Sequence, residues 1–235
     1  MELELSPVRE TAAPRIDTNR LWPITGALAG LFGFGATILT DIHVATDRRD
    51  ELTSMANVGE INQRAAHLSI VLGFTCVVLL LAFAAYWRSV VEPKTPRSIA
   101  SRIVTQGLTA AAGALSLGYG WKGASAIYHA NGMDHGTYDD MGLYIYYILN
   151  DFGSYIGWFS VTVAAGAVVW MSLRERSIPI WIGIFSCIPV LAVLAWTVLT
   201  GLPGFPGVVS PIWMAVACTG LAIHGTFVRD EQEFR

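Results

Sequence analysis

Histidine and carboxylate side chains are the groups of this chain best suited to chemistry, and one short segment concentrates them. In the string His129-Ala-Asn-Gly-Met-Asp134-His135, two imidazoles and a carboxylate lie close together. Neutral imidazole and carboxylate together suit zinc, copper or iron. The spacing matches no strong metal signature such as H-E-x-x-H. We therefore keep a metal ion held by His129, Asp134 and His135 as a hypothesis beside a solvated loop, and predict no other cofactor.

A second set of ionisable residues is dispersed in the sequence, yet each member lies near the end of a long apolar stretch. If the fold brought these groups together, they could hold a ligand by ion pairs or exchange protons with a substrate. Whether they meet depends on the elements that carry them. We call this set the polar collar: Asp41, His43, His67, Lys122 and Asp151.

The chain contains six apolar stretches, each close to the length of a bilayer crossing, and the first four carry the polar collar. A helix needs about 20 mostly apolar residues to cross about 30 Å of hydrocarbon. Because lipid offers no partner to backbone polar groups, each stretch must satisfy its own hydrogen bonds as a helix. The chain is therefore predicted to be all-α, a polytopic membrane protein with six transmembrane helices. The stretches are residues 21–41, 68–87, 103–122, 153–173, 180–199 and 208–224.

Composition supports this class and leaves room for one domain. Hydrophobic residues make up 53% of the chain and charged residues only 14%, against about 25% charged residues in soluble domains. We predict a flexible cytoplasmic arm at 1–20, the transmembrane domain at 21–227 and a short cytoplasmic tail at 228–235. The acidic start does not resemble a secretory signal, so the first stretch is expected to remain as a span. No Lys/Arg cluster is present, so no nucleic-acid partner is expected.

Lysine and arginine are distributed unevenly between the two ends of the predicted helices. Eleven of the 15 fall in the N-terminal arm, the second and fourth loops and the C-terminal tail. Cytoplasmic flanks of spans retain positive charge. Both termini are therefore predicted to be cytoplasmic, as an even number of spans requires, with the chain in the cell (inner or plasma) membrane. The four basic residues on the other side are Arg48, Arg49, Arg64 and Lys122.

The predicted orientation places the polar collar at one height. Counting about 20 residues from the cytoplasmic anchor of each helix leads to the outer surface near every collar member, with His43 just beyond. One interpretation is that helices end there because water begins there. The other is that some of these side chains face inward and line an outward-opening vestibule, with Lys122 and Asp151 as an ion pair.

The third and fourth helices are predicted to continue beyond the bilayer as a helical hairpin. Residues 121–129 and 141–151 are compatible with helix, and residues 131–137 between them are typical of a turn. Tyr119 and Trp158 belong to a group of aromatic residues in this region. Since Tyr and Trp favour the headgroup level, we interpret most of this group as an interfacial belt.

Small residues and one serine predict local packing. Gly26 and Gly30 are spaced four apart, as are Gly153 and Gly157, and this pattern lets two helices approach closely. Ser98 precedes the third helix and could cap it. These patterns predict helix contacts and a helix start, without establishing a dimer face.

Three classes of function are compatible with these features. The favoured one is a non-catalytic membrane protein whose outward vestibule receives a small ligand, a lipid headgroup or a partner protein. Besides the lipid bilayer, a membrane-protein partner or a second copy of the chain is left open. The alternative is a membrane enzyme acting on a lipophilic substrate at the outer interface, with His and Asp in acid–base or metal chemistry. A small-solute transporter is disfavoured because no ionisable residue lies at the midplane and no internal repeat is present.

Overall fold

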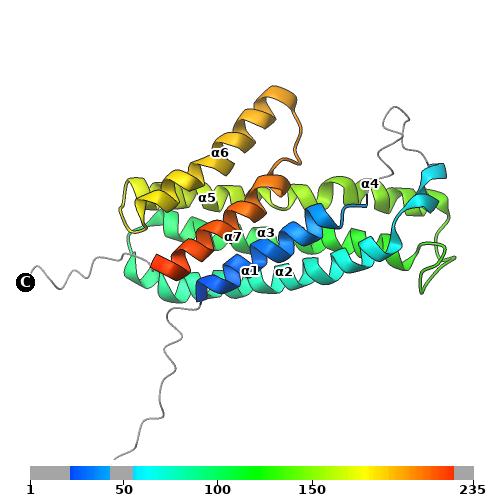
Figure 1. The fold of residues 1–235 in the computed structure, drawn as a ribbon, viewed down its shortest axis with the longest axis horizontal. Helices are drawn as coiled ribbons and strands as arrows, with labels where there is room; N and C mark the ends of the chain where they lie inside the picture. The colour runs from blue at the N-terminus through cyan, green and yellow to red at the C-terminus, as the bar shows by residue number, and fades with distance from the viewer. Residues whose placement is uncertain (1–21, 43–54, 225–235) are drawn as a thin grey trace, which may run out of the picture.

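The chain folds as a bundle of helices, with no strand in its described residues (Figure 1). The computed structural model describes residues 22–42 and 55–224, apart from the side chains of Ala56, Asn57 and Asp151. The predicted arm, the predicted tail and His43 lie outside the described residues. The elements are α1 Trp22–Phe34, the π-helical turn η2 Gly35–Leu39, the 3₁₀ turn η4 Met55–Glu60, α2 Gln63–Val90, the 3₁₀ turn η5 Glu92–Lys94, α3 Ile99–Ile127, α4 Asp140–Ile156, α5 Phe159–Leu173, α6 Ile180–Thr200 and α7 Pro206–His224.

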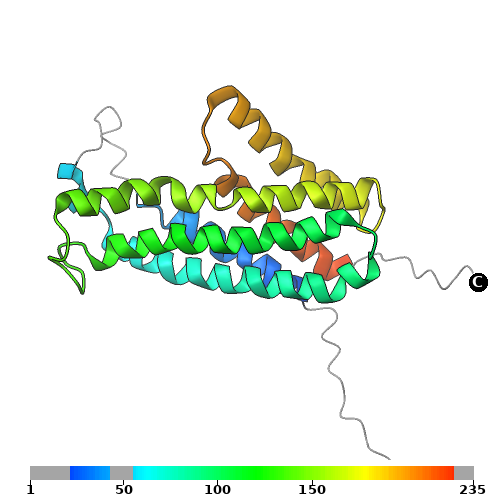
Figure 2. The same cartoon turned by 180° about the vertical axis from the view of Figure 1, so that it is seen from behind.

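Three long rods form the centre of the bundle. Helix α2, helix α3 and the α4–α5 pair run side by side in alternating directions (Figure 2). Helices α1 and α7 pack against each other, and α6 leans away from the rest (Figure 1). We call the end where α3 passes into α4 the hairpin end. Helix α1 begins, and helix α7 ends, at the opposite end of the bundle.

Several of these helices are suited to a membrane. The prediction of a helical membrane protein is supported, but the number of six spans stays a prediction because α3 is not among the segments that are long and apolar enough. Helix α3 packs against α2, α4 and α5 and buries small and polar residues among them. A helix enclosed by protein does not need the hydropathy of one enclosed by lipid. Within the described residues, the five segments long and apolar enough to cross a membrane are Trp22–Leu39, Gln63–Lys94, Asp140–Leu173, Ile180–Thr200 and Pro206–His224.

The predicted helical hairpin is confirmed, and it is built from long elements. Helices α4 and α5 form one segment of 34 residues, interrupted only between Ile156 and Phe159. At 1.5 Å per residue this segment is about 50 Å long, and the 29 residues of α3 are about 43 Å long. Both exceed the hydrocarbon thickness of about 30 Å. How far the hairpin projects from a bilayer stays a prediction.

The small-residue patterns do mark close helix contacts within the chain. A Cβ atom at Gly30 would lie 2.5 Å from the backbone nitrogen of Ala215 on α7. A Cβ atom at Gly157 would lie 2.7 Å from the side chain of Leu115 on α3. The glycines therefore hold α1 against α7 and α4 against α3, at separations that a larger residue would prevent.

Helix starts follow the expected capping chemistry. The Ser98 hydroxyl accepts a hydrogen bond of 3.0 Å from the amide of Ser101, which confirms it as the cap of α3. Asp139 caps α4 in the same manner, through a 2.9 Å bond from the amide of Gly142. Such caps satisfy backbone donors that have no partner within the helix.

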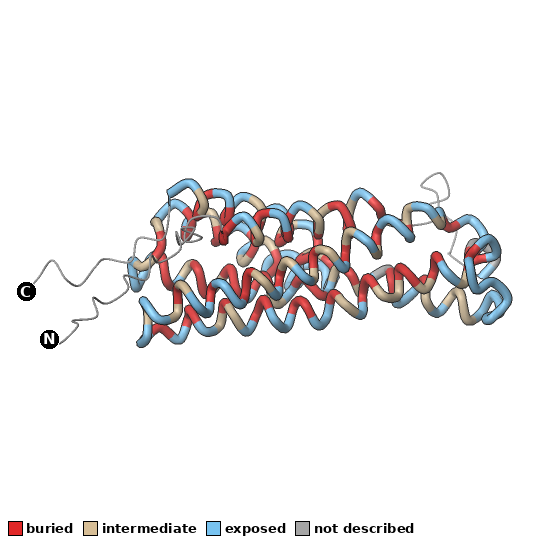
Figure 3. The backbone as a smooth tube through the Cα atoms, turned by 90° about the horizontal axis from the view of Figure 1, so that it is seen from below, coloured by how far each residue is buried: buried red, intermediate tan, exposed pale blue. Residues whose placement is uncertain are grey.

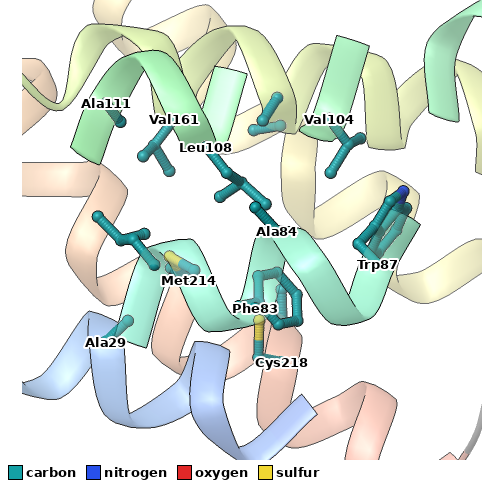
Figure 4. Close-up of a cluster of buried hydrophobic side chains, with 14 of the residues drawn as sticks. Ala29, Phe83, Ala84, Trp87, Val104, Leu108, Ala111, Val161, Met214 and Cys218 are labelled. Carbon is teal, nitrogen blue, oxygen red and sulfur yellow. The ribbon is translucent and has the colours of Figure 1, made fainter. Parts of the chain in front are cut away.

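The core lies where α1, α2, α3, α5 and α7 meet. Phe83 and Trp87 of α2 pack near Leu108 of α3 and Met214 of α7 (Figure 4). The indole of Trp87 donates to the carbonyl of Ser101 over 3.1 Å, so its polar atom is satisfied inside the apolar core. Buried and exposed residues alternate along the helices of the bundle (Figure 3). Apolar packing thus fills the middle of the bundle, and the core continues to Ala36, Tyr119 and Trp158.

Candidate functional site

Helix α1 continues into a π-helical turn, Gly35–Leu39, instead of ending regularly. The amide of Thr40 donates to the carbonyl of Gly35 over 3.0 Å, five residues back instead of four. The Thr40 hydroxyl donates to the carbonyls of Gly35 and Ala36 at 2.9 and 3.1 Å. Few helices contain a turn of this kind, and those turns that do occur are often found at functional sites.

The carbonyl oxygen of Ala36 in this turn joins three helices. It accepts hydrogen bonds from Lys122 Nζ of α3 at 2.8 Å and from Ser69 Oγ of α2 at 2.6 Å, besides the bond from Thr40. Lys122 is fully buried. This is the single hydrogen bond of Lys122 within the described part of the chain, although an ammonium group has three donors.

Asp41 supplies the opposite charge to this ammonium. Its carboxylate interacts electrostatically with Lys122. The carboxylate also accepts hydrogen bonds of 2.9 Å from the Tyr155 hydroxyl and from the Ile42 amide. An ammonium buried away from water is costly unless opposite charge and hydrogen bonds compensate it. The turn that follows α1 provides both, through Asp41 and the Ala36 carbonyl.

Three further side chains form a hydrogen-bonded triangle next to Lys122. The hydroxyls of Thr37 and Tyr119 share a hydrogen bond of 2.9 Å. The Trp158 indole donates to both, over 3.2 Å to Thr37 and 3.3 Å to Tyr119. We call the joined residues the Lys122 cluster: Ala36, Thr37, Thr40, Asp41, Ser69, Tyr119, Lys122, Tyr155 and Trp158.

The interpretation as an interfacial belt is wrong for Tyr119 and Trp158, because both side chains are fully buried. Tyr119 lies three residues before Lys122 and so shares its inward face of α3. Gly73 on α2 leaves room for the ring, since a Cβ atom there would lie 2.2 Å from Tyr119 Cγ. No feature of the sequence near Tyr119 reveals that space, which belongs to another helix.

Three buried polar side chains, two on α4 and one just after α3, lack partners in the described structure. They are Asn150 at Oδ1, Ser154 at Oγ and His129 at both ring nitrogens. Buried polar groups are normally hydrogen-bonded, so an exception calls for water, an ion or a ligand. The sequence pattern did not single out Asn150 or Ser154.

The packing of α3 on α4 places two of these groups at the level of the Lys122 cluster along the bundle. A Cβ atom at Gly118 would lie 2.6 Å from the backbone nitrogen of Ser154, so these two positions share one level. Lys122 is one turn further along α3, and Asn150 is one turn back along the antiparallel α4 (Figure 2). A turn rises about 5.4 Å, so Lys122 and Asn150 also share one level. His129 follows Lys122 by seven residues and lies just past the end of α3 at Ile127, closer to the hairpin end.

The structure brings together only part of the predicted polar collar. Asp41 and Lys122 lie close enough to interact electrostatically, without a direct ion pair between the two among the described contacts. The side chain of Asp151 lies outside the described part, so its ion pair with Lys122 stays a prediction, as does any role of His43. His67 lies elsewhere, exposed on the outside of α2.

The predicted metal loop offers no complete ligand set in the described residues. Among them, no three His, Cys, Asp or Glu side chains gather as a metal site would require. His129 is buried, whereas Asp134 is exposed and His135 Nδ1 lies 3.2 Å from the carbonyl of Gly132. The metal hypothesis therefore gains no support from the fold.

Comparison of the chain with protein-family models, with curated proteins and with solved structures finds no match. The interpretation of this site consequently depends on its own geometry and chemistry.

Removing the Tyr119 hydroxyl should weaken the cluster measurably. We expect Tyr119→Phe to lower the free energy of unfolding by about 1 kcal/mol, because the ring keeps its packing while the hydrogen bonds with Thr37 and Trp158 are lost. Tyr86→Phe is the matched control, since Tyr86 is exposed on α2. Detergent-induced unfolding, followed by tryptophan fluorescence, measures both variants. Equal stability of the two would contradict the role of the hydroxyl.

Proposed function

We propose that this chain is a non-catalytic multi-pass membrane protein that binds a small oxygen-bearing ligand from the outer side, at the Lys122 cluster. In this proposal the chain crosses the cell membrane six times, because α3 spans it in addition to the five segments named above. Both termini are then cytoplasmic. The hairpin end then faces outward. The observation that carries the proposal is the fully buried Lys122 with one hydrogen bond.

The cost of burying Lys122 is the first argument. Ionisable side chains within membrane helices are rare, face the bundle interior and mark binding sites or ion pathways. Tyr119 and Trp158, which lie in the Lys122 cluster, are also part of the apolar core. A buried ammonium at the edge of this core costs more than an apolar side chain of similar size would, and this cost favours a role in binding.

The donors and acceptors around Lys122 indicate the ligand chemistry. Two donors of its ammonium have no hydrogen-bond acceptor among the described residues. The unpartnered amide oxygen of Asn150, a hydrogen-bond acceptor, lies at the same level, and the unpartnered imidazole of His129 lies closer to the hairpin end. A ligand that carries an oxygen acceptor for the ammonium and a hydroxyl donor for Asn150 Oδ1 would satisfy these groups together. The Asp41 carboxylate would repel a ligand with several negative charges, so the proposed ligand carries at most one negative charge.

Access from outside is supported by the placement of the polar groups. Asn150 lies at the level of Lys122, and His129, which follows the end of α3, lies closer to the hairpin end. Helix α1 begins and helix α7 ends at the opposite end, so both described ends of the chain lie on one side. The excess of lysine and arginine predicted for the cytoplasmic side agrees with that arrangement.

External labelling of an introduced cysteine tests this function. In intact cells, Asn150→Cys should react with a membrane-impermeant, negatively charged methanethiosulfonate several-fold faster than with a positively charged one, because Lys122 attracts the anion. Ile148→Cys is the control, since Ile148 is exposed on the same helix and should show no such preference. The wild type, with Cys76 and Cys218 buried and Cys187 partly buried, defines the background.

Two outcomes would overturn the proposal. Asn150→Cys that reacts with neither reagent would show that no aqueous path leads from outside to the level of Lys122. Equal charge preference at Asn150→Cys and Ile148→Cys would show that the ammonium does not act on a ligand at this level.

A further inference from the structure

A groove separate from the Lys122 cluster lies on the outside of the bundle at the hairpin end. It runs between the start of α2 and the end of α3 and has a volume of about 630 Å³. Gly123 lets the two helices touch beneath it, because a Cβ atom there would lie 2.1 Å from Ile70 Cδ1. Gln63 donates to the carbonyl of Ala126 over 2.9 Å and joins the helices at the end of the groove. The groove is therefore a built feature of the α2–α3 contact.

The groove is basic at one end and apolar along its length. Arg64 and His67 are exposed one helical turn apart, and Leu68 and Val71 follow on the same side of α2. Leu68, Val71 and Ile127 are 50%, 52% and 42% exposed in the isolated chain. From Arg64 to Val71 the helix rises about 10 Å. Such a surface matches a molecule with a charged head and an apolar tail.

The charge at the basic end has no partner within the described chain. Arg64 makes no hydrogen bond or ion pair with any described residue. None of the residues that line the groove is acidic. A guanidinium group pairs with phosphate through two parallel hydrogen bonds. The unpaired arginine thus favours an anionic phosphate ligand.

We propose that this groove binds one anionic glycerophospholipid, with its phosphate at Arg64 and His67 and an acyl chain along Leu68, Val71 and Ile127. The apolar side chains of the groove favour a lipid over free phosphate, because inorganic phosphate would leave these side chains without an apolar partner. A headgroup that also carries a positive charge would be repelled by Arg64. Phosphatidylglycerol is therefore preferred over phosphatidylcholine.

Native mass spectrometry of the full-length protein tests the lipid site. The detergent-purified protein is mixed with equal amounts of phosphatidylglycerol and phosphatidylcholine, and the bound lipids are counted. We expect one phosphatidylglycerol to be retained about tenfold over phosphatidylcholine. Arg64→Gln should reduce this preference to near unity. Arg88→Gln should keep it, because Arg88 is the exposed arginine at the other end of α2.

Two further arms distinguish a bound lipid from a bound inorganic anion. Ile127→Trp fills the apolar part of the groove and should reduce retention of both lipids. Added inorganic phosphate should not displace the bound lipid. The same preference in Arg64→Gln as in the wild type would overturn the proposal, and so would the absence of any preference in the wild type. Displacement by inorganic phosphate would overturn it as well, because it would show an anion site without a lipid tail.

Discussion

Lys122→Met is expected to lower the free energy of unfolding by about 3 kcal/mol, the lower end of the cost of breaking a buried charge pair. The substitution removes the charge that compensates Asp41 and leaves that carboxylate inside the bundle. The Ala36 carbonyl keeps its hydrogen bonds from Ser69 and Thr40, so the loss comes mainly from Asp41. Asp41 is only partly buried, which is why the upper end of the range is not expected.

A second substitution isolates the charge interaction. Lys122→Met combined with Asp41→Asn should recover much of the lost stability, because neither charge is then left alone. Lys94→Met is the matched control, since Lys94 is the only other lysine of the chain and is exposed. It should change the stability by less than about 0.5 kcal/mol. Detergent-induced unfolding in bicelles measures the wild type, Lys122→Met, Asp41→Asn, the double variant and Lys94→Met.

An outcome without coupling would contradict this account. If the two single substitutions added up to the effect of the double variant, Asp41 and Lys122 would not stabilise each other. A Lys122→Met protein as stable as Lys94→Met would show that the buried ammonium contributes nothing to the fold.

Gly118→Ala is expected to lower the free energy of unfolding by about 3 kcal/mol, near the upper end of the usual cost of overpacking. The added Cβ atom would lie 2.6 Å from the backbone carbon of Gly153 and from the backbone nitrogen of Ser154. Backbone atoms in a helix cannot rotate away as a side chain can. Helix α4 must therefore move from α3, which also separates Asn150 from Lys122.

Helix α3 offers its own control for this substitution. A Cβ atom at Gly113 would meet no atom within 4 Å, so Gly113→Ala should be neutral or slightly stabilising through better helix propensity. Unfolding of both variants is compared with the wild type in bicelles. The accessibility of Asn150→Cys should also change in the Gly118→Ala background and not in the Gly113→Ala background. Equal stability of the two alanine variants would contradict the close approach of α3 and α4.

Local features were the part of the fold that could be predicted from the sequence. Apolar stretches near the length of a crossing require helices whatever their neighbours are. Ser98 caps α3, as its residue type and its place before the helix predicted. Gly30 approaches α7 closely, as the spacing of small residues along α1 predicted. Helix α3 is less apolar than the other long helices, because the helices packed around it accommodate small and polar residues.

Tyr119 and Trp158 show why the candidate site could be predicted only in part. Their residue types favour the membrane interface when they face lipid. Here they face inward, where their polar atoms bond to each other and to Thr37. The space for the Tyr119 ring is provided by Gly73 of α2, so the outcome depends on a residue remote in sequence.

The sequence by itself determined that this chain forms long apolar helices with ionisable residues near their ends. Hydropathy and helix length are properties of contiguous residues, so no neighbour is needed to define them. Only the tertiary structure decided that Lys122 donates to the Ala36 carbonyl and interacts electrostatically with Asp41, while His67 lies on the outside of α2. The partner of a side chain depends on how each helix is rotated and shifted against its neighbours, and contacts between distant residues set both.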